Sequence, residues 1–302
     1  MVVGIHAGFL SDISTLAEYL TVNGIFRVAV PVFCIISGFY FYPALTNGTY
    51  RGWLRRIAIL YASWMTIYAF LWFCIPDLSF FGIAKLIKDV LIGYYHLWYI
   101  SGLLGSALLL VGMHNLPAKT LALSALVLYS IGVLIQYLGN YHYFSGSALD
   151  TAFNLHWSHR NFMFLSYPFF TIGYLINKYS IHQKISARQC ALLTSTAVLA
   201  LLCESAFNFY QSGREGGFDN YISLIFVCPL IFITARSATI QSSHKTISLY
   251  ASGIFFIHVL VLHFMYQWLT IKATPATILA IITSFAASFV IIKVNNRYPV
   301  LL

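Results

Sequence analysis

Charged side chains are scarce in this chain of 302 residues, where Asp, Glu, Lys and Arg together make up 8% of the composition. Soluble domains usually carry about 25% charged residues, because charges keep a water-facing surface solvated. Apolar residues supply 60% of the chain, and the mean hydropathy is +0.79. The composition therefore excludes a water-soluble globular protein and predicts a polytopic protein whose solvent is the lipid bilayer.

Several other features are also lacking. The five cysteines lie in apolar stretches with no Cys-x-x-Cys motif, so they are interpreted as small buried residues rather than a metal or redox site. No basic residue precedes the first apolar stretch, as a signal peptide would require. Internal repeats, low-complexity tracts and a soluble domain are not found. We expect one all-α transmembrane domain over residues 1–302, with no metal and no permanently bound cofactor.

Apolar segments recur along the whole chain. A membrane-spanning helix needs about 20 mainly apolar residues. Nine segments fit this template: Asn23–Leu45, Ile57–Ile75, Tyr94–Met113, Leu121–Leu138, Phe162–Ile176, Cys190–Phe209, Tyr221–Ala235, Ile247–Trp268 and Pro275–Ile292. A tenth segment, Met1–Leu10, has only half the length, so either the true start lies upstream or the first helix lacks its inner half.

The loops between these segments differ in charge, and cytoplasmic loops collect Lys and Arg. With the N-terminus inside, eleven basic residues lie on the inner side: Arg51, Arg55, Arg56, Lys119, Lys178, Lys184, Arg188, Arg236, Lys245, Lys293 and Arg297. Five lie on the outer side: Lys85, Lys88, Arg160, Arg214 and Lys272. The sequence therefore predicts ten spans with both termini in the cytoplasm. Because topology accounts for the net charge of +9, no nucleic-acid partner is expected.

Ionisable residues inside the predicted spans are candidates for function, because lipid solvates them poorly. His6 lies near the end of the first segment and Arg27 near the start of the second, so the turn between them places both at similar depth. A nearby cation would keep the imidazole neutral, which suits a general base. The alternative is structural: His6 fills a buried hydrogen bond and Arg27 extends toward the outer headgroups.

Further histidines have similar alternatives. His258 lies in the middle of a span, where a structural hydrogen bond competes with a functional role. His263, five residues on, is off the same helical face, so metal binding by the pair is weakly supported. His96 and Trp98 open a span at the outer interface, where an aromatic belt also accounts for them. The long outer loop Gly139–Arg160 could rim an acceptor site, although a solvated loop is favoured.

Three arginines, Arg51, Arg55 and Arg56, open the third span at the predicted cytoplasmic side. Positive-inside topology explains them fully. Three guanidinium groups at one membrane mouth would also bind a phosphate-rich cytosolic ligand through bidentate hydrogen bonds. Both interpretations remain open, and they are compatible.

Five sequence blocks together resemble the membrane-bound acyltransferase 3 family. The most specific is an Arg, a Pro between apolar residues, a Phe-rich run and then Ser-Gly-Phe. In chain order the blocks are Met1–His6, Phe26–Phe39, Tyr95–Tyr99, Arg160–Phe164 with Pro168–Tyr174, and Ser248–His258. The resemblance covers almost the whole chain. One departure is that position 6 leaves no room for the basic residue that usually begins the family's first helix.

The resemblance implies a bacterial inner-membrane O-acetyltransferase that takes acetyl from cytosolic acetyl-CoA and modifies a sugar hydroxyl of a surface glycan such as O-antigen. For the mechanism, we hypothesise that Arg51, Arg55 and Arg56, the last two foremost, hold the coenzyme phosphates. His6 is then the general base or the acetyl carrier, and Arg27 stabilises the oxyanion or orients His6. His96, Trp98 and His258 are expected to position these groups. A secondary transporter or glycan flippase is the alternative, although residues 1–150 and 151–302 show no matching repeat.

Overall fold

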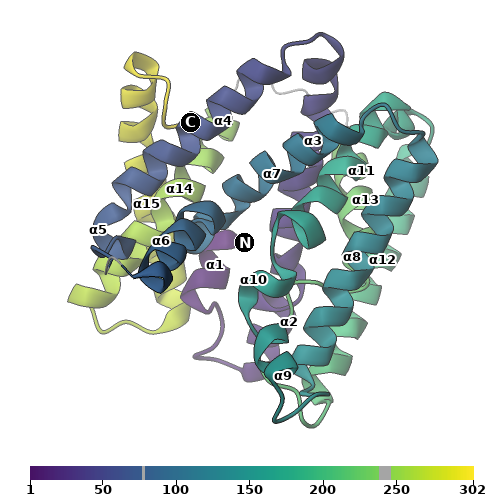
Figure 1. Cartoon of the computed structure of the whole chain (residues 1–302). Helices are drawn as coiled ribbons and strands as arrows, with labels where there is room; N and C mark the ends of the chain where they lie inside the picture. Colours follow the sequence, from purple (N-terminus) through teal and green to yellow (C-terminus); the bar gives the residue numbers. More distant parts are fainter. Residues whose placement is uncertain (77–78, 238–245) are drawn as a thin grey trace. The chain divides into compact units, whose positions relative to one another are not determined.

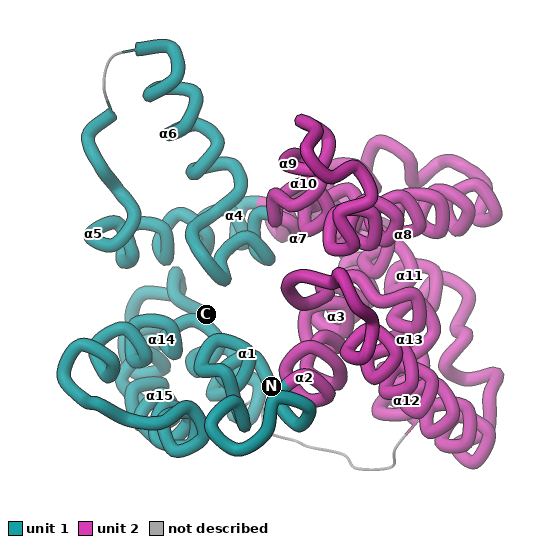
Figure 2. The backbone as a smooth tube through the Cα atoms, turned by 90° about the horizontal axis from the view of Figure 1, so that it is seen from below, with its two compact units in different colours: residues 1–18, 55–101, 240–302 teal, residues 19–54, 102–239 magenta. Residues whose placement is uncertain are grey.

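The computed structural model describes residues 1–76, 79–237 and 246–302, which leaves out Lys245 among the predicted inner-side residues. Every regular element within these ranges is helical, and none of the residues described forms a strand (Figure 1). The all-α prediction is confirmed for this part of the chain. Two compact units share it (Figure 2): unit 1 takes residues 1–18, 55–101 and 240–302, and unit 2 takes residues 19–54 and 102–239.

Six helical segments in the described residues are long and apolar enough to cross a membrane. They are Thr15–Thr46, Tyr95–Met113, Ala118–Asn140, Ala187–Tyr210, Thr246–Trp268 and Ala273–Arg297. Each overlaps one predicted span. The remaining four predicted spans coincide with shorter or interrupted helices, so the number of ten is not confirmed.

Each of the four remaining segments differs from a single long helix in its own way. Ile57–Ile75 contains the end of α4 (Tyr50–Ile67) and the short α5 (Ala69–Trp72). Phe162–Ile176 begins as a π-helix, η3 (Phe162–Ser166), before α11 (Tyr167–Lys178). Tyr221–Ala235 contains α13 (Leu224–Ser237), which has a proline inside it, and Met1–Leu10 forms only α1 (Val2–Ala7). Apolar runs predicted the positions of these helices but not their lengths.

Unit 2 is built around α11 and α3 (Ala29–Thr46), whose backbones touch. A Cβ atom at Gly38 would lie 1.9 Å from the Phe170 carbonyl oxygen, and one at Gly173 would lie 2.0 Å from that of Ile35. Only glycine permits such an approach from both sides. Most side chains of α11 are buried, so its apolar run packs against protein rather than lipid.

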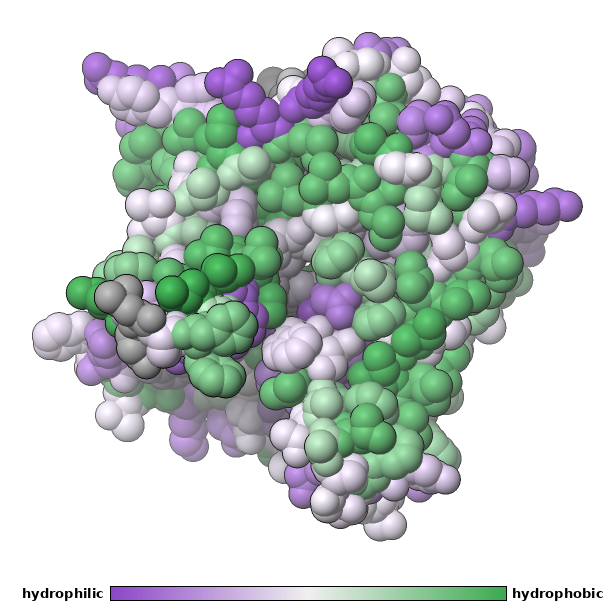
Figure 3. Space-filling view, viewed as in Figure 1, coloured by the Kyte–Doolittle hydropathy of each residue, from purple (hydrophilic) through white to green (hydrophobic). Residues whose placement is uncertain are grey.

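The other elements of unit 2 surround this pair: η1 (Ile25–Val28), α8 (Ala118–Asn140), α9 (Ala148–Phe153), α10 (His156–His159), η4 (Ile181–Gln183), α12 (Ala187–Tyr210) and α13. Three helices contain residues of both units: α2 (Thr15–Val22), α4 and α7 (Trp98–Met113). Large apolar side chains stay exposed on α8 and α12, among them Leu123, Leu134, Leu192 and Phe207. Broad apolar areas cover the face in Figure 3, as a lipid-facing surface requires.

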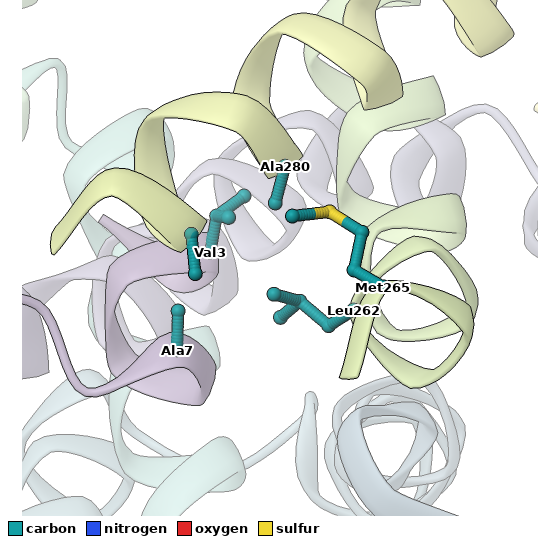
Figure 4. Close-up of a cluster of buried hydrophobic side chains, with 6 residues drawn as sticks. Val3, Ala7, Leu262, Met265 and Ala280 are labelled. Atoms are coloured by element: carbon teal, nitrogen blue, oxygen red, sulfur yellow. The ribbon is translucent and has the colours of Figure 1, made fainter. Parts of the chain in front are cut away.

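Unit 1 centres on two long helices, α14 (Thr246–Trp268) and α15 (Ala273–Arg297), which pack along each other. Helix α1 docks on both through a buried cluster that contains Val3, Leu262 and Ala280 (Figure 4). Beyond α1, the Asp12 carboxylate accepts a hydrogen bond from the backbone N–H of Thr274 at 3.0 Å. Apolar packing therefore holds one face of α1, and hydrogen bonding holds the segment that follows it.

Unit 1 also contains η2 (Tyr95–Leu97) and α6 (Phe80–Ile92). Helix α6 buries none of its side chains: Phe80 and Phe81 are 80% and 82% exposed, and it carries Lys85 and Lys88. A short helix with exposed aromatic residues and lysines is typical of the membrane interface.

Candidate active site

Three histidine rings gather in unit 1 from segments far apart in the sequence. The ring centroids of His6 and His258 are 5.2 Å apart, those of His96 and His258 are 5.1 Å apart, and those of His6 and His96 are 6.4 Å apart. They belong to α1, η2 and α14. The structure therefore brings together three of the residues predicted from sequence, and we call them the histidine cluster.

His258 lies inside the cluster with a fixed tautomer. Its side chain is fully buried, and its Nδ1 lies 2.7 Å from the Phe255 carbonyl oxygen and 3.1 Å from that of Ile254. Both partners can only accept, so Nδ1 carries the proton. In the neutral ring, Nε2 then has a free lone pair, and it has no hydrogen-bond partner among the described residues. This nitrogen is equipped to accept a proton.

His96 is held by a strained turn. The preceding Tyr95 has a φ of 48°, a left-handed conformation that costs a non-glycine residue about 1 kcal/mol or more. Tyr95 remains half exposed with its ring 4.7 Å from that of His6, whereas His96 is 2% exposed. The turn thus places two consecutive rings, those of Tyr95 and His96, within 6.4 Å of the His6 ring. Strain of this kind is common where a backbone is shaped for function.

Tyr68 packs against the cluster, although nothing in the sequence marks it out among the other tyrosines. Its hydroxyl donates to the Phe256 carbonyl oxygen at 2.7 Å and accepts from the Leu260 N–H at 3.2 Å. These two backbone groups are four residues apart in α14, so the hydroxyl occupies a place in the helical hydrogen-bond ladder around His258. The Tyr68 ring also lies 5.3 Å from His96. Tyr68 therefore contacts two of the three elements that carry the cluster.

The position of His6 follows from the docking of α1. His6 is partly exposed, in contrast to the other two histidines, which are buried. Val3 and Ala7 on the same short helix are buried against α14 and α15 (Figure 4), and the Tyr266 hydroxyl donates to the Ala7 carbonyl oxygen at 3.3 Å. His6 is consequently the member of the cluster that solvent or a substrate reaches first.

Arg27 lies in unit 2, where it forms a buried ion pair. Its guanidinium binds the Asp219 carboxylate, and its Nη2 donates to the Asn23 side-chain oxygen at 2.6 Å. Arg160 Nη1 lies 3.5 Å from the other oxygen of Asp219. Burial would raise the pKa of Asp219, but the guanidinium groups of Arg27 and Arg160 outweigh it and hold that pKa well below its usual range. The predicted partnership of Arg27 with His6 stays a prediction.

Asp219 was not selected from the sequence, where it is one of several acids in an apparent outer loop. Its position just before Asn220 and between the buried aromatic residues Phe218 and Tyr221 is the only signal that could have marked it. An acid embedded in an aromatic segment usually has a fixed partner.

The remaining predicted residues are placed as follows. Trp98 begins α7, directly after η2. Arg51, Arg55 and Arg56 are exposed along the first two turns of α4, and Arg56 donates to the carbonyl oxygen of Leu302 at 3.3 Å. Their role in coenzyme binding stays a prediction. No group of three or more His, Cys, Asp or Glu residues within the described ranges has the geometry to hold a metal ion.

Comparisons with known proteins identify the family of the chain. The profile of the acyltransferase domain that defines the acyltransferase 3 family matches residues 1–293. A serine/alanine racemase of Enterococcus gallinarum is similar to this chain, with 28% identity over 232 residues, 68% of this chain and 31% of the racemase. The chain thus spans less than a third of that relative's length. No solved structure matches the chain.

Proposed function

We propose that this chain, a member of the acyltransferase 3 family with several helices of membrane-spanning length, is a multi-pass membrane acyltransferase that acetylates a sugar hydroxyl. The proposed donor is cytosolic acetyl-CoA. The proposed acceptor is a bacterial cell-surface polysaccharide or its lipid-linked precursor, and the proposed location is the inner membrane with both termini in the cytoplasm.

The observation that carries this proposal is the histidine cluster. Acyl transfer to a hydroxyl needs a base, because a sugar hydroxyl is a poor nucleophile while it keeps its proton. The cluster supplies three imidazoles within 6.4 Å, and the structure fixes the proton of His258 on Nδ1. His96 and His258 are buried, and in such a low-dielectric surrounding a hydrogen bond to a substrate is stronger than in water.

In the proposed reaction, His6 accepts the proton of the acceptor hydroxyl while the hydroxyl oxygen attacks the thioester carbonyl. The carbon–sulfur bond then breaks, and the imidazolium returns the proton to the departing coenzyme A thiolate. The products are a sugar acetate and free coenzyme A, so atoms and charges balance. His96 and His258 position the His6 ring. Trp98, the first residue of α7, is the proposed support for the position of His96. Arg51, Arg55 and Arg56 are the proposed ligands of the coenzyme phosphates.

The test is transfer of labelled acetyl from acetyl-CoA to surface glycan in membranes that contain the full chain, followed by mass spectrometry of the glycan. General-base catalysis usually contributes about 10²- to 10⁴-fold, so His6→Ala should lower the rate by at least about 100-fold. His263→Ala is the matched control, since this histidine lies on α14 with His258 and bonds only to Gln267 on the surface, at 3.1 Å. Its rate should match that of the unchanged protein.

Full acetylation by a stably inserted His6→Ala protein would contradict the catalytic role of the cluster. Counterflow of a labelled sugar without any acetyl transfer would instead favour the transporter alternative.

A further inference from the structure

Unit 2 contains a cavity with many polar residues in its lining, none of which belongs to the histidine cluster. Its volume of about 600 Å³ is within the range of small-ligand sites. Its walls come from the end of α8, from α9 and α10, and from the loop before Asp219. Arg27, Asn140, Asp150, His159 and Asp219 are among the residues that line it.

The cavity wall is built by fixed hydrogen bonds. The side-chain oxygen of Gln136 on α8 accepts from the backbone N–H groups of Asp219, at 3.1 Å, and Asn220, at 2.8 Å. Asn140, one turn further on, donates to the Gly217 carbonyl oxygen at 3.0 Å. The Asn220 side chain in turn donates to the His159 carbonyl oxygen at 3.1 Å, which ties α10 to the same loop. Such a wall is preorganised before any ligand arrives.

One buried group in this wall, His159, makes only a long contact with Asp219. His159 is 3% exposed, and neither of its ring nitrogens has a hydrogen-bond partner among the described residues; the nearest charge, on Asp219, is 3.9 Å from Nε2. A buried imidazole without a hydrogen bond is costly unless something in the cavity completes it. The ring lines the cavity, but both of its nitrogens are buried, so the imidazole must turn toward the cavity to meet a ligand hydroxyl.

The charges of the lining identify the kind of ligand. Two guanidinium groups, Arg27 and Arg160, and three carboxylates, Asp150, Glu215 and Asp219, line the cavity. His142 lies between two of the carboxylates, 2.8 Å from an Asp150 oxygen and 3.2 Å from a Glu215 oxygen. Both arginines are already engaged by Asp219. A phosphate-rich ligand such as coenzyme A needs cations without such partners, and so does the carboxylate of an amino acid. A neutral molecule with many hydroxyl groups suits this lining, because each hydroxyl can donate to a carboxylate and accept from a guanidinium or imidazole.

We propose that this cavity binds a neutral sugar unit of the acceptor glycan, with Asp219 and His159 as hydrogen-bonding partners of its hydroxyls. That this sugar is the acceptor rests on the proposed function. The binding of a sugar as such does not depend on acyl transfer.

Saturation-transfer NMR on the full chain in lipid nanodiscs tests the site directly. The probes are methyl glycosides of common bacterial hexoses, deoxyhexoses and N-acetylated amino sugars, with L-serine as a separate sample. Thr151→Trp and Asn154→Trp fill the rim of the cavity, where both side chains are exposed. Leu149→Trp is the control, since Leu149 also lies on α9, is 52% exposed and does not line the cavity.

At least one glycoside should give a signal that both rim variants lose and that Leu149→Trp keeps. The absence of any glycoside signal, or a signal that survives both rim variants, overturns the proposal. A serine signal that is lost in the rim variants overturns it in favour of an amino-acid site.

Acetyl transfer measured on the same preparations separates this inference from the proposed function. If sugar binding is lost in the rim variants but the protein never transfers acetyl, the sugar site stands and the proposed function fails. If transfer occurs and neither rim variant changes the KM for the acceptor, the proposed function stands and the sugar site fails.

Discussion

At the scale of single residues, the hydroxyl of Tyr68 sets the local geometry of the histidine cluster. It donates to the Phe256 carbonyl oxygen and accepts from the Leu260 N–H, two backbone groups four residues apart in α14. His258 lies between these two residues in the chain. We expect removal of the hydroxyl to leave both bonds unmade and to shift the imidazole from its present position.

Tyr68→Phe should therefore lower kcat for acetyl transfer while leaving the KM for acetyl-CoA unchanged, with a loss of about 1 kcal/mol in stability for the missing hydrogen bonds. Steady-state kinetics and thermal unfolding in detergent measure both effects. Tyr61→Phe is a suitable control, because the Tyr61 hydroxyl donates to Val90 in the same unit without contacting the cluster. If both variants lose activity in proportion to stability, Tyr68 has only a structural role.

The residues of the histidine cluster and their neighbours differ in whether the sequence alone could identify them. His6, His96 and His258 could be selected one by one, since an imidazole in an apolar segment is unusual. That their rings meet could not be derived, because their spacing in the chain contains no contact information. Tyr68 is one of 21 tyrosines in the chain and carries no distinguishing signal. Asp219 could not be selected, because its partner, Arg27, is 192 positions away in the chain.

At the scale of helices, the contact between α3 and α11 is the tightest one described. Gly38 on α3 and Gly173 on α11 each lie against a carbonyl oxygen of the opposite helix. Helices in lipid gain little from the hydrophobic effect when they associate, so close backbone packing must supply the attraction.

Gly38→Ala should force the two helices apart and destabilise the protein by about 3 kcal/mol, the upper end of the usual cost of overpacking. The expected result is a clearly lower melting temperature in detergent. Gly112→Ala on α7 is the control, because a Cβ atom there meets nothing within 4 Å and alanine favours the helix. Equal melting temperatures for the two variants would show that the contact between α3 and α11 is not essential to stability.

Helix positions followed from apolar runs, but their lengths did not, and α11 shows why. Its segment is as apolar as a lipid-facing span, yet nine of its twelve residues are buried in protein. Burial in lipid and burial in protein both select apolar side chains, so composition does not distinguish them. Breaks such as the one at Tyr68, between α4 and α5, depend on tertiary hydrogen bonds that the apolar pattern does not record.

At the scale of the whole molecule, the proposed orientation rests on loop charge, with eleven basic residues assigned inside and five outside. It places Leu302 in the cytoplasm and Lys272, between α14 and α15, on the outer side. A green fluorescent protein fused after Leu302 should fluoresce, and one fused after Lys272 should remain dark. Alkaline phosphatase at the same two positions should give the opposite pattern. Fluorescence of the fusion after Lys272 would contradict the proposed orientation and indicate the opposite one.

Unit 1 is assembled from three separate stretches of chain, and the histidine cluster draws one ring from each. A ribosome releases His6 at the very beginning of synthesis and His258 only after most of the chain has been made. The nascent protein therefore stays without its proposed catalytic centre throughout membrane insertion, and the centre forms only when α14 arrives. Chains cut short by a premature stop before this helix lack His258 altogether, so the proposed catalytic centre predicts that such products are inactive.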